Sequence, residues 1–572
     1  MNRRELIKLT AFGALGLASF PAQARRLSFE SLLEFKPLGN VTLIFTSDLH
    51  GHLSPLYFAE PMNLLAPEPL KGTPGYLAGM DFLNYYKIKP GTVEAYTGSC
   101  VGFIKLAKTY GKTGGAAQIA SVIKAIVTER GRDRCLILDG GDTWVTSGIA
   151  LLTKGLAIVE WLNYVGYDYM VGHWDFTVGK EQFLDIIKNR LKAKFVSYNI
   201  SEEPFGDLVF KPYEITERGG VKIGIIGSSF PYTPLANPRV YTEGWSFGVR
   251  PQELQNYVDE LRQKHRVDLI VLLSHDGLAL DIALMRQIKG IDVVISGHTH
   301  DITPVPVKVG DTLIISPGSH GKFVGRLDLD VQGGKVKDFR LKLIPVLSEY
   351  IPQDRGALEI VKRAYAPHQK ELSEVIGTTE TLLYKRDTVF STWDRLIGQA
   401  LFEHFQGIDA VMASTSPGFR WGTTLLPNSP IRVEDVYNVL GMTYPEVFIT
   451  KRKGKDLIAT WEDVADNVFN PNPLYQQGGD MSRIYGVEYE LKINARQGER
   501  IRNVKIGGKP LEPEREYLVA VYGGPPPNVP PEKANVREIV VNFIRKKKSI
   551  KIDTTPNVKI LDHSYNTRCY WS

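Results

Sequence analysis

Cysteine is scarce in this chain, with three residues in 572. So few cysteines exclude a fold built on many disulfides, and no C-x-x-C motif points to redox chemistry. An excess of one charge is also missing, because 69 basic and 63 acidic residues leave a formal net charge of only +6. A nucleic-acid partner is therefore not expected.

Long apolar runs are missing too, apart from an interrupted one at the start of the chain. There, Arg3 and Arg4 precede an apolar stretch that ends in Ala22-Gln23-Ala24, the order of a secretory signal. The stretch contains Lys8 and is too short to span a bilayer. Residues 2–8 resemble a twin-arginine export signal, with a Sec signal as the alternative. We expect residues 1–24 to be a signal peptide, export to the periplasm, and no membrane segment afterwards.

Between residue 41 and about residue 345, short β-rich runs alternate with helical patterns. Helices are expected over Ala116–Arg130, Gln252–Lys264 and Asp281–Lys289. This alternation predicts an α/β layered domain with largely parallel strands. The expected strands are Val41–Thr46, Cys135–Leu138, Tyr169–Val171, Phe195–Ser197, Lys222–Ile226, Leu269–Leu273, Val293–Ile295 and Thr312–Ile315.

The pattern changes after a charged helical stretch that follows Ile351-Pro352. We predict a first domain over residues 25–348, a connecting helix over 349–376 and a second, smaller α/β domain over 377–572. Cys135 is interpreted as a core residue, whereas Cys100 and Cys569 could be free or paired.

Five short motifs of Asp, His and Gly stand at the ends of expected strands. Because the carboxyl ends of parallel strands meet, we expect these motifs on one edge of one sheet. They are Asp48-Leu49-His50, Gly140-Gly141-Asp142, Gly172-His173-Trp174-Asp175, Ser274-His275-Asp276 and Gly297-His298-Thr299-His300.

Imidazole and carboxylate side chains without thiolates suit Mn, Fe, Zn or Co. A single His of this kind is more often a hydrogen-bonded strand-end residue, and a single Asp is often a helix cap. Six or seven such side chains exceed the needs of one tetrahedral ion. The motifs together therefore predict two ions, which can activate water and clamp a tetrahedral oxyanion.

The order of these motifs resembles the metallophosphoesterases, and specifically the two-domain 5′-nucleotidase family. The second half is similar to that family in Gly407–Met412, Ile431–Tyr437 and Tyr485–Tyr489. The resemblance implies a calcineurin-like αββα sandwich, a connecting helix and a smaller α/β 5′-nucleotidase-type domain. It assigns the first metal to Asp48, His50 and His300, the second to His173, His275 and His298, and the bridge between them to Asp142.

The third motif departs from the family pattern Gly-Asn-His-Glu-Phe-Asp. His173 replaces the asparagine and can still bind a metal, whereas Trp174 replaces the histidine that stabilises the phosphate transition state. Thr177 replaces the aspartate that orients that histidine. The resemblance therefore does not favour hydrolysis of phosphate esters.

Trp174, the long segment after His52 and the run Gly478–Arg483 resemble the thiosulfohydrolases of the periplasmic sulfur-oxidising Sox system, a branch of this family. The resemblance implies a dimanganese enzyme, with Zn²⁺ or Fe²⁺ as alternatives. Its substrate would be a cysteine S-thiosulfonate on the C-terminal arm of the SoxY subunit of the SoxYZ carrier, and sulfate would be released.

Several residues are candidates for the chemistry and for substrate contact. Trp174 is expected to form the wall of an apolar channel for a thin peptide arm, with a plain core tryptophan as the alternative. For each arginine the alternative is a surface salt bridge. The long segment after His52 is expected to cover the metals and to meet the partner. The catalytic candidates are Asp142, His173, Trp174 and Arg420, the substrate-binding candidates are Trp174, Arg420 and Arg483, and the residues expected to orient ligands are Asp175 and Asp276.

Two other functions stay open. A periplasmic 5′-nucleotidase or cyclic-nucleotide phosphodiesterase would release phosphate from substrates such as AMP. A non-catalytic partner-binding protein would keep its metals for structure alone. In each case we expect a monomer without a nucleic-acid partner.

Overall fold

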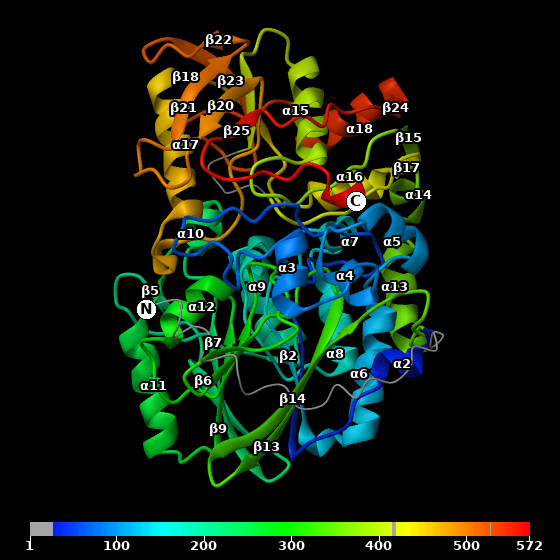
Figure 1. The fold of residues 1–572 in the computed structure, drawn as a ribbon, viewed down its shortest axis with the longest axis vertical. Coiled ribbons are helices and arrows are strands. Elements are labelled where there is room, and N and C mark those ends of the chain that lie inside the picture. The colour runs from blue at the N-terminus through cyan, green and yellow to red at the C-terminus, as the bar shows by residue number, and fades with distance from the viewer. Residues whose placement is uncertain (1–26, 414–418, 527, 572) are drawn as a thin grey trace.

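The computed structural model describes residues 27–413, 419–526 and 528–571. The predicted signal at 1–24 and the segment 414–418, which precedes the Arg420 region, lie outside the described residues. In Figure 1 the chain from blue to green forms the lower half of the molecule, and the chain from yellow to red forms the upper half.

Two six-stranded sheets build the lower half, in the orders β14-β13-β1-β2-β3-β4 and β11-β12-β10-β9-β7-β6. In the first sheet β1, β2, β3 and β4 pair in parallel, and β13 and β14 are added antiparallel at one edge. In the second sheet the four inner strands pair in parallel, and both edge strands are antiparallel. The strands of the first sheet are β1 Val41–Thr46, β2 Cys135–Asp139, β3 Tyr169–Met170, β4 Lys194–Phe195, β13 Phe323–Gln332 and β14 Lys335–Pro345. Those of the second are β6 Tyr213–Arg218, β7 Val221–Ser228, β9 Leu269–Ser274, β10 Val293–Ser296, β11 Val307–Val309 and β12 Thr312–Ile315.

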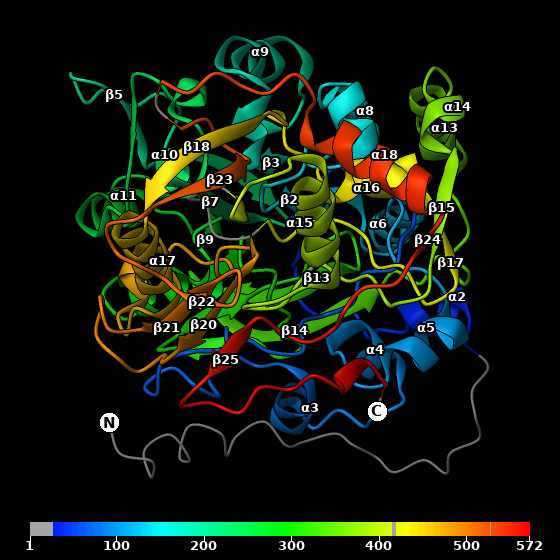
Figure 2. The ribbon, with the colours of Figure 1, turned by 90° about the horizontal axis from the view of Figure 1, so that it is seen from above.

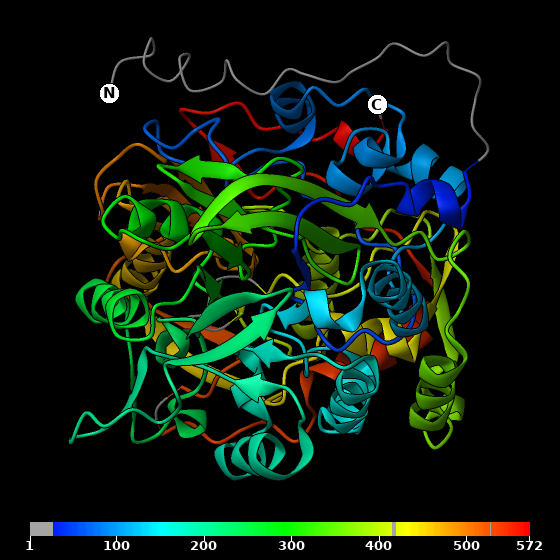
Figure 3. The same ribbon diagram turned by 90° about the horizontal axis from the view of Figure 1, so that it is seen from below.

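The strands form because both of their faces are apolar, and the pleat divides each strand between two cores. In β1, Leu43 and Phe45 join the core between the two sheets, whereas Ile44 joins the core beneath the helices. Helices α6 Ala116–Arg130 and α8 Leu156–Val165 cover the first sheet, and α11 Pro251–Gln263 and α12 Leu278–Met285 cover the second. The result is an αββα sandwich, which Figure 3 shows from below with helices on both sides of the strands.

Shorter elements complete the lower half. The two-stranded sheet β5-β8 lies outside the sandwich sheets. These elements are α2 Phe29–Leu33, α7 Gly148–Leu152, α9 Lys180–Asp185, β5 Ile200–Glu202, α10 Thr233–Ala236 and β8 Trp245–Phe247.

The connection to the upper half is broken into two helices, where the sequence predicts one. Helix α13 spans Arg355–Tyr365, helix α14 spans Gln369–Leu372, and strand β15 begins at Val375. Pro367 lies between the helices, and a proline has no N–H to continue a helical ladder. The predicted helix over 281–289 is also displaced, because α12 starts after Gly277 and ends at Met285.

The upper half contains three small sheets, ordered β17-β15-β24, β18-β23-β16-β19 and β22-β21-β20-β25. Its helices are α15 Thr392–His404, α16 Val433–Val439, α17 Gly454–Phe469 and α18 Val536–Lys547. Its strands are β15 Val375–Thr379, β16 Ala410–Ala413, β17 Ser429–Arg432, β18 Val447–Lys453, β19 Ile484–Tyr485, β20 Val487–Leu491, β21 Ile501–Ile506, β22 Lys509–Pro510, β23 Glu516–Tyr522, β24 Ser549–Ile550 and β25 Val558–Ile560.

The long segment after His52 folds into three short helices, α3 Gly79–Tyr86, α4 Val93–Gly98 and α5 Phe103–Tyr110. The end of the chain returns to them, as the red trace in Figure 2 shows. There a disulfide joins Cys100 to Cys569, with their Cα atoms 5.5 Å apart. This pairing settles the open question about the two cysteines and fastens the C-terminal segment to the lower half.

Within the described ranges, no helix combines the length and the apolar character needed to cross a bilayer.

Candidate metal centre

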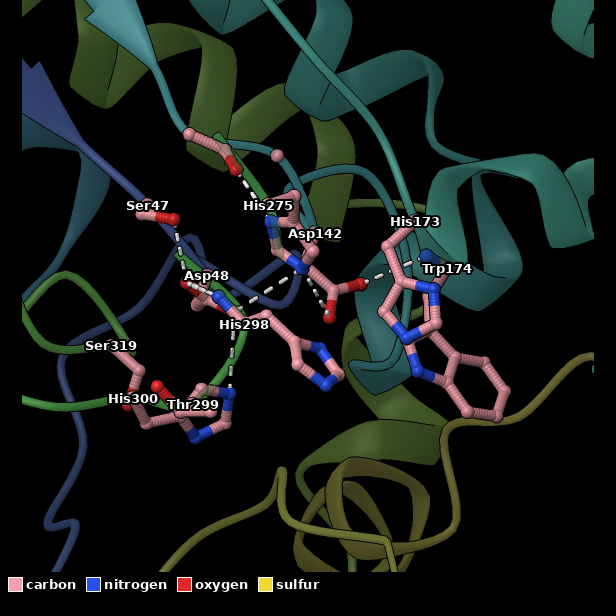
Figure 4. A network of polar contacts seen from close by, with 12 residues as sticks. Ser47, Asp48, Asp142, His173, Trp174, His275, His298, Thr299, His300 and Ser319 are labelled. Atoms are coloured by element: carbon pink, nitrogen blue, oxygen red, sulfur yellow. Dashed lines mark hydrogen bonds and ion pairs between the residues drawn. The ribbon is translucent and has the colours of Figure 1, made fainter. Parts of the chain in front are cut away.

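The five motifs converge, although they come from two sheets and not from one, so the prediction of a single sheet edge is wrong. Three follow β1, β2 and β3 of the first sheet, and two follow β9 and β10 of the second. The inner strands of both sheets end at the same side of the sandwich, which brings the loops of one sheet opposite those of the other. Figure 4 shows the side chains meeting between the two sets of loops.

Two groups of side chains are close enough to hold a metal ion. The first consists of Asp48, His50 and His300, and the second of Asp48, Asp142 and His275. The Nε2 atoms of His50 and His300 lie 2.9 Å apart, and His300 Nε2 lies 3.4 Å from Asp48 Oδ1. The Nε2 atom of His275 lies 3.7 Å from Asp48 Oδ1 and 3.6 Å from Asp142 Oδ2. The two groups together fit a dinuclear metal site.

The far side of two imidazole rings is already held by the protein. His50 Nδ1 lies 2.9 Å from the Thr146 hydroxyl, and His275 Nδ1 faces the carbonyl oxygen of Gly140. Such contacts fix the tautomer and direct Nε2 toward a metal. Among the described residues, His275 Nε2 is buried without a hydrogen-bond partner, and it is the atom that faces Asp48 and Asp142. A cation bound between these groups would satisfy that nitrogen.

His173 and His298 lie at the same site but complete neither group. The ring centroids of both lie 5.4 Å from that of His275, and they lie 5.1 Å from each other. His298 Nε2 faces the carbonyl oxygen of Gln477 at 2.8 Å. The resemblance gives the bridging role to Asp142, whereas in this structure Asp48 is the carboxylate common to both groups. The assignment of individual ligands stays a prediction.

The backbone of the site is strained. Five of the seven predicted ligands have a positive φ: 53° for Asp48, 52° for His50, 59° for Asp142, 75° for His298 and 60° for His300. Non-glycine residues rarely adopt this conformation, and each instance costs roughly 1–3 kcal/mol. Strain concentrated on candidate ligands indicates that the surrounding fold holds them in place for function.

Burial shifts the pKa values of the candidate ligands, upward for the carboxyl groups and downward for the imidazoles. Burial raises the pKa of Asp48 to about 6 and, with Asp175 nearby, raises the pKa of Asp142 well above its ordinary value. It lowers the pKa of His50 and His300 well below the ordinary value, so both rings are neutral and keep a lone pair. A cation at this site would stabilise the buried carboxylates as anions.

Asp175 holds the loop that carries Asp142. Its two carboxylate oxygens accept hydrogen bonds from the backbone N–H groups of Asp142 at 2.9 Å, Thr143 at 3.0 Å, Trp144 at 2.7 Å and His173 at 3.2 Å. This agrees with the expected orienting role. Asp276 instead accepts from the Ser228 hydroxyl at 2.8 Å.

Replacing Asp175 by asparagine should lower the free energy of unfolding by about 2–4 kcal/mol, because an amide group would face N–H donors that then lose their acceptor. It should also weaken metal binding, because the Asp142 loop would relax. Chemical denaturation and metal titration would measure both effects. Asp292→Asn is the control, since Asp292 accepts from the N–H of Ile270 far along the second sheet. Equal metal binding in the two variants would contradict this role for Asp175.

A cavity opens beside the candidate ligands, with aromatic walls. Trp174 is 5% exposed, and its ring lies 4.6 Å from that of Trp421 and 5.7 Å from that of Phe419. Arg420 also lines the cavity and donates to the carbonyl oxygen of His298 at 2.7 Å. The cavity is lined by His50, Asp142, His173, Trp174, Phe230, Ala236, His298, His300, Phe419, Arg420, Trp421, Gln477, Gly478 and Gly479.

Arg483 is not brought to this cavity. Its guanidinium is buried and donates to Asp480 at 2.8 Å and lies 3.1 Å from Asp394, inside the upper half. Such a network explains the residue without a substrate. The motif match that suggested Arg483 was short, so we do not carry it into the site.

Sequence reasoning missed other residues of the site. Phe230 stacks on His298 at 3.9 Å, and Gln477 and Trp421 line the cavity. His320 stacks on Phe58 at 3.6 Å and lies 5.0 Å from the ring of His50. Only His320 had a signal, because Gly318-Ser319-His320 follows a buried strand as the five motifs do.

The long segment after His52 does not line this cavity, since none of its described lining residues falls between 53 and 113. It does line a neighbouring cavity that reaches His300, through residues such as Glu60 and Leu64. The segment also packs against the upper half, where the side-chain amide of Asn63 donates to Asp387 at 3.0 Å and the Ala59 N–H donates to the Thr424 hydroxyl at 2.9 Å. The expected cover over the metals is not seen at this cavity, and the partner surface stays a prediction.

Comparison with known proteins agrees with this architecture. Residues 375–524 match the model of the 5′-nucleotidase C-terminal domain. The structure of the sulfate thiohydrolase SoxB of Thermus thermophilus superposes with a TM-score of 0.89 at 41% identity, over 93% of this chain and 99% of that one. A 5′-nucleotidase precursor of the same species, 22% identical, has a TM-score of 0.73 over 92% of this chain and 100% of that one, which shows the fold alone.

A venom 5′-nucleotidase of Crotalus adamanteus is 34% identical over 48% of this chain and 50% of its own length. The chain spans about half the length of the venom 5′-nucleotidases that it matches.

The sandwich and the paired ligand groups define a hydrolase of the metal-dependent phosphoesterase type. The chain belongs to the two-domain 5′-nucleotidase family of metallophosphoesterases. Within that family it is similar to SoxB.

Proposed function

We propose that this chain is an exported dimanganese hydrolase that cleaves the terminal sulfonate from a cysteine S-thiosulfonate on the SoxY arm of SoxYZ. The observation that carries the proposal is the indole of Trp174 in the wall of the cavity beside the ligands. Family nucleotidases have a catalytic histidine at that position. The histidines that line the cavity, His50, His173, His298 and His300, are all predicted ligands, so none among the described lining residues replaces the missing one.

The shape and polarity of the cavity suit this substrate. Aromatic walls can surround a thin, largely apolar sulfur–sulfur chain and peptide segment without requiring hydrogen bonds from it. A sulfonate group is tetrahedral and rich in oxygen, as a phosphoryl group is, but carries less charge. One guanidinium, that of Arg420, can supply two N–H donors to such a group.

The residues around the cavity have different roles in the proposed reaction. The Asp and His ligands bind the ions, and Arg420 orients the sulfonate. When bound, the two ions supply Lewis acidity and activate a water molecule. The oxygen of water bonds to the sulfonate sulfur as the S–S bond breaks, which gives sulfate and a cysteine persulfide. A persulfide leaves without much protonation, so the loss of the family's His–Asp pair is tolerable.

The test is to load the purified protein with manganese and to incubate it with SoxYZ that carries the thiosulfonate. The sulfate that is released is then measured. AMP in parallel tests the nucleotidase alternative by release of phosphate. Sulfate release with little phosphate supports the proposal. Phosphate release comparable with that of nucleotidases, or turnover of neither substrate, overturns it in favour of one of the two alternatives.

Trp174→His sharpens this test. Sulfate release should fall by about tenfold or more, because the imidazole shortens the aromatic wall, and weak phosphatase activity should appear. Trp245→His is the matched control, because Trp245 is 2% exposed and packs on Phe176 and Phe210 outside the cavity. Unchanged sulfate release without phosphatase activity would remove Trp174 as the determinant.

A further inference from the structure

Two arginines of the upper half donate hydrogen bonds to three successive backbone oxygens of the loop 297–300, which carries two predicted metal ligands. Arg420 donates to the oxygen of His298 at 2.7 Å. Arg386 donates to the oxygen of Thr299 at 2.6 Å and to that of His300 at 3.3 Å. The lower half thus provides the loop, and the upper half fixes its backbone.

Arg386 differs from Arg420 in its surroundings. It is 3% exposed, and it does not line the cavity beside the candidate ligands. Its guanidinium lies 3.3 Å from Glu60 Oε2, in the long segment after His52. Its hydrogen bonds to the loop that carries His300 go to backbone oxygens.

Glu60 is held in turn from two sides. Its other carboxylate oxygen accepts from the buried ammonium of Lys322 at 2.5 Å, and its backbone oxygen accepts from the hydroxyl of Tyr570 at 2.9 Å. Lys322 also donates to the oxygen of Phe58 at 2.9 Å. Glu60, Lys322 and Arg386 are each at most 6% exposed. A buried, hydrogen-bonded carboxylate between two cations fixes the direction of the Arg386 fork.

Lysine could not replace this fork. A planar guanidinium presents donors in fixed directions, whereas an ammonium is a point charge on a flexible stem. Arg386 uses one terminal nitrogen for the oxygen of Thr299 and the other for both the oxygen of His300 and Glu60. Because His300 has a positive φ of 60°, its backbone needs such outside support.

We propose that Arg386, aligned by Glu60, is a positioning residue that sets the affinity of one of the two metal sites, the one that includes His300. The inference rests on metal binding at the proposed centre and not on the identity of the substrate. The long segment after His52 and the upper half thereby contribute to a metal site without supplying a ligand.

The test is a titration of the full-length, metal-free protein with Mn²⁺ alone, following free Mn²⁺ by its electron paramagnetic resonance signal. In Arg386→Lys, one of the two dissociation constants should rise by about 10- to 100-fold while the other changes less than threefold. Glu60→Gln should weaken the same site by a smaller factor. A merely structural role would weaken both sites together or neither.

The matched control is Arg500→Lys. Arg500 is also 3% exposed, and its guanidinium pairs with Asp466 at 2.7 Å and faces backbone oxygens of the upper half. Both Mn²⁺ constants should be unchanged in this variant. Equal weakening by Arg500→Lys, or unchanged Mn²⁺ binding in both Arg386→Lys and Glu60→Gln, overturns the inference.

The outcomes separate this inference from the proposed function. Wild-type protein that binds two Mn²⁺ ions but releases no sulfate would overturn the proposed function and leave the inference standing. If the wild type releases sulfate but Arg386→Lys leaves both Mn²⁺ dissociation constants unchanged, the proposed function stands and the inference is overturned. An increased KM with unchanged Mn²⁺ binding would make Arg386 a substrate contact and overturn its positioning role.

Discussion

Replacing Asp48 by asparagine is expected to reduce hydrolysis by about a thousandfold or more. Asp48 is the carboxylate common to both candidate metal groups. An amide oxygen carries no charge, so both ions would be bound more weakly and the developing oxyanion would lose stabilisation. Several kcal/mol of that stabilisation depend on the ions, and about 4 kcal/mol corresponds to a factor of a thousand in rate.

The same substitution should have the opposite effect on the metal-free protein. Burial raises the pKa of Asp48 to about 6, so at pH 7 the folded metal-free protein holds a carboxylate that the unfolded chain ionises more easily. Removing that charge should therefore raise the melting temperature without metal. With Mn²⁺ present the wild type should be the more stable protein, because ligand binding adds about 2.7 kcal/mol at a hundred times the dissociation constant.

The measurement is turnover together with thermal unfolding, each with and without Mn²⁺. Asp328→Asn is the control, since Asp328 is fully buried and accepts from Thr42 and Arg326 away from the site. It should lose stability in both conditions and keep its activity per folded molecule. If Asp48→Asn keeps more than a tenth of the activity, the shared position of Asp48 has no catalytic importance.

The motifs could be predicted from the sequence because the signal is local. Each short motif directly follows an apolar run, and the structure ends strands β1 and β9 within one residue of the predicted limits. Only the family resemblance predicts the αββα architecture. The alternation of strands and helices in the sequence does not show how the strands divide between two sheets. That is why the motifs were expected on a single edge.

The sequence contains no pattern that predicts contacts between distant parts of the chain. Glu60 and Arg386 are 326 positions apart, and each alone is an ordinary charged residue in a polar stretch. Trp421 and Phe230 contribute only apolar walls, which the sequence does not distinguish from core. Arg483 was suggested by a short motif match, and the fold places its guanidinium in an ion pair with Asp480.

The backbone conformation of the site could not be predicted from the sequence either. A positive φ, as at His50 and His300, is uncommon for residues other than glycine, although histidine adopts it more often than most of them. The local sequence would instead place such turns at the neighbouring glycines. The strained backbone was therefore the least predictable feature of the site, and it is the feature that Arg386 supports.

The second large effect is expected from the disulfide. Changing both Cys100 and Cys569 to serine should lower the free energy of unfolding by about 2–5 kcal/mol. The bond joins positions 469 residues apart, so it restricts the unfolded chain across almost its whole length. In the folded state the loss should be felt first where the C-terminal segment meets the long segment after His52, at the contact of Tyr570 with Glu60.

Thermal unfolding with and without a phosphine reductant measures this effect. Reductant should lower the melting temperature of the wild type to that of the double-serine variant and should leave that variant unchanged. Cys135→Ala is the control, because Cys135 is buried and free, so its protein should respond to reductant as the wild type does. If the double-serine variant has the same melting temperature as the oxidised wild type, the hydrogen bonds of the C-terminal segment suffice to hold the two halves together. In that case the disulfide adds a covalent link to an arrangement that Asn63, Glu60 and their partners already maintain.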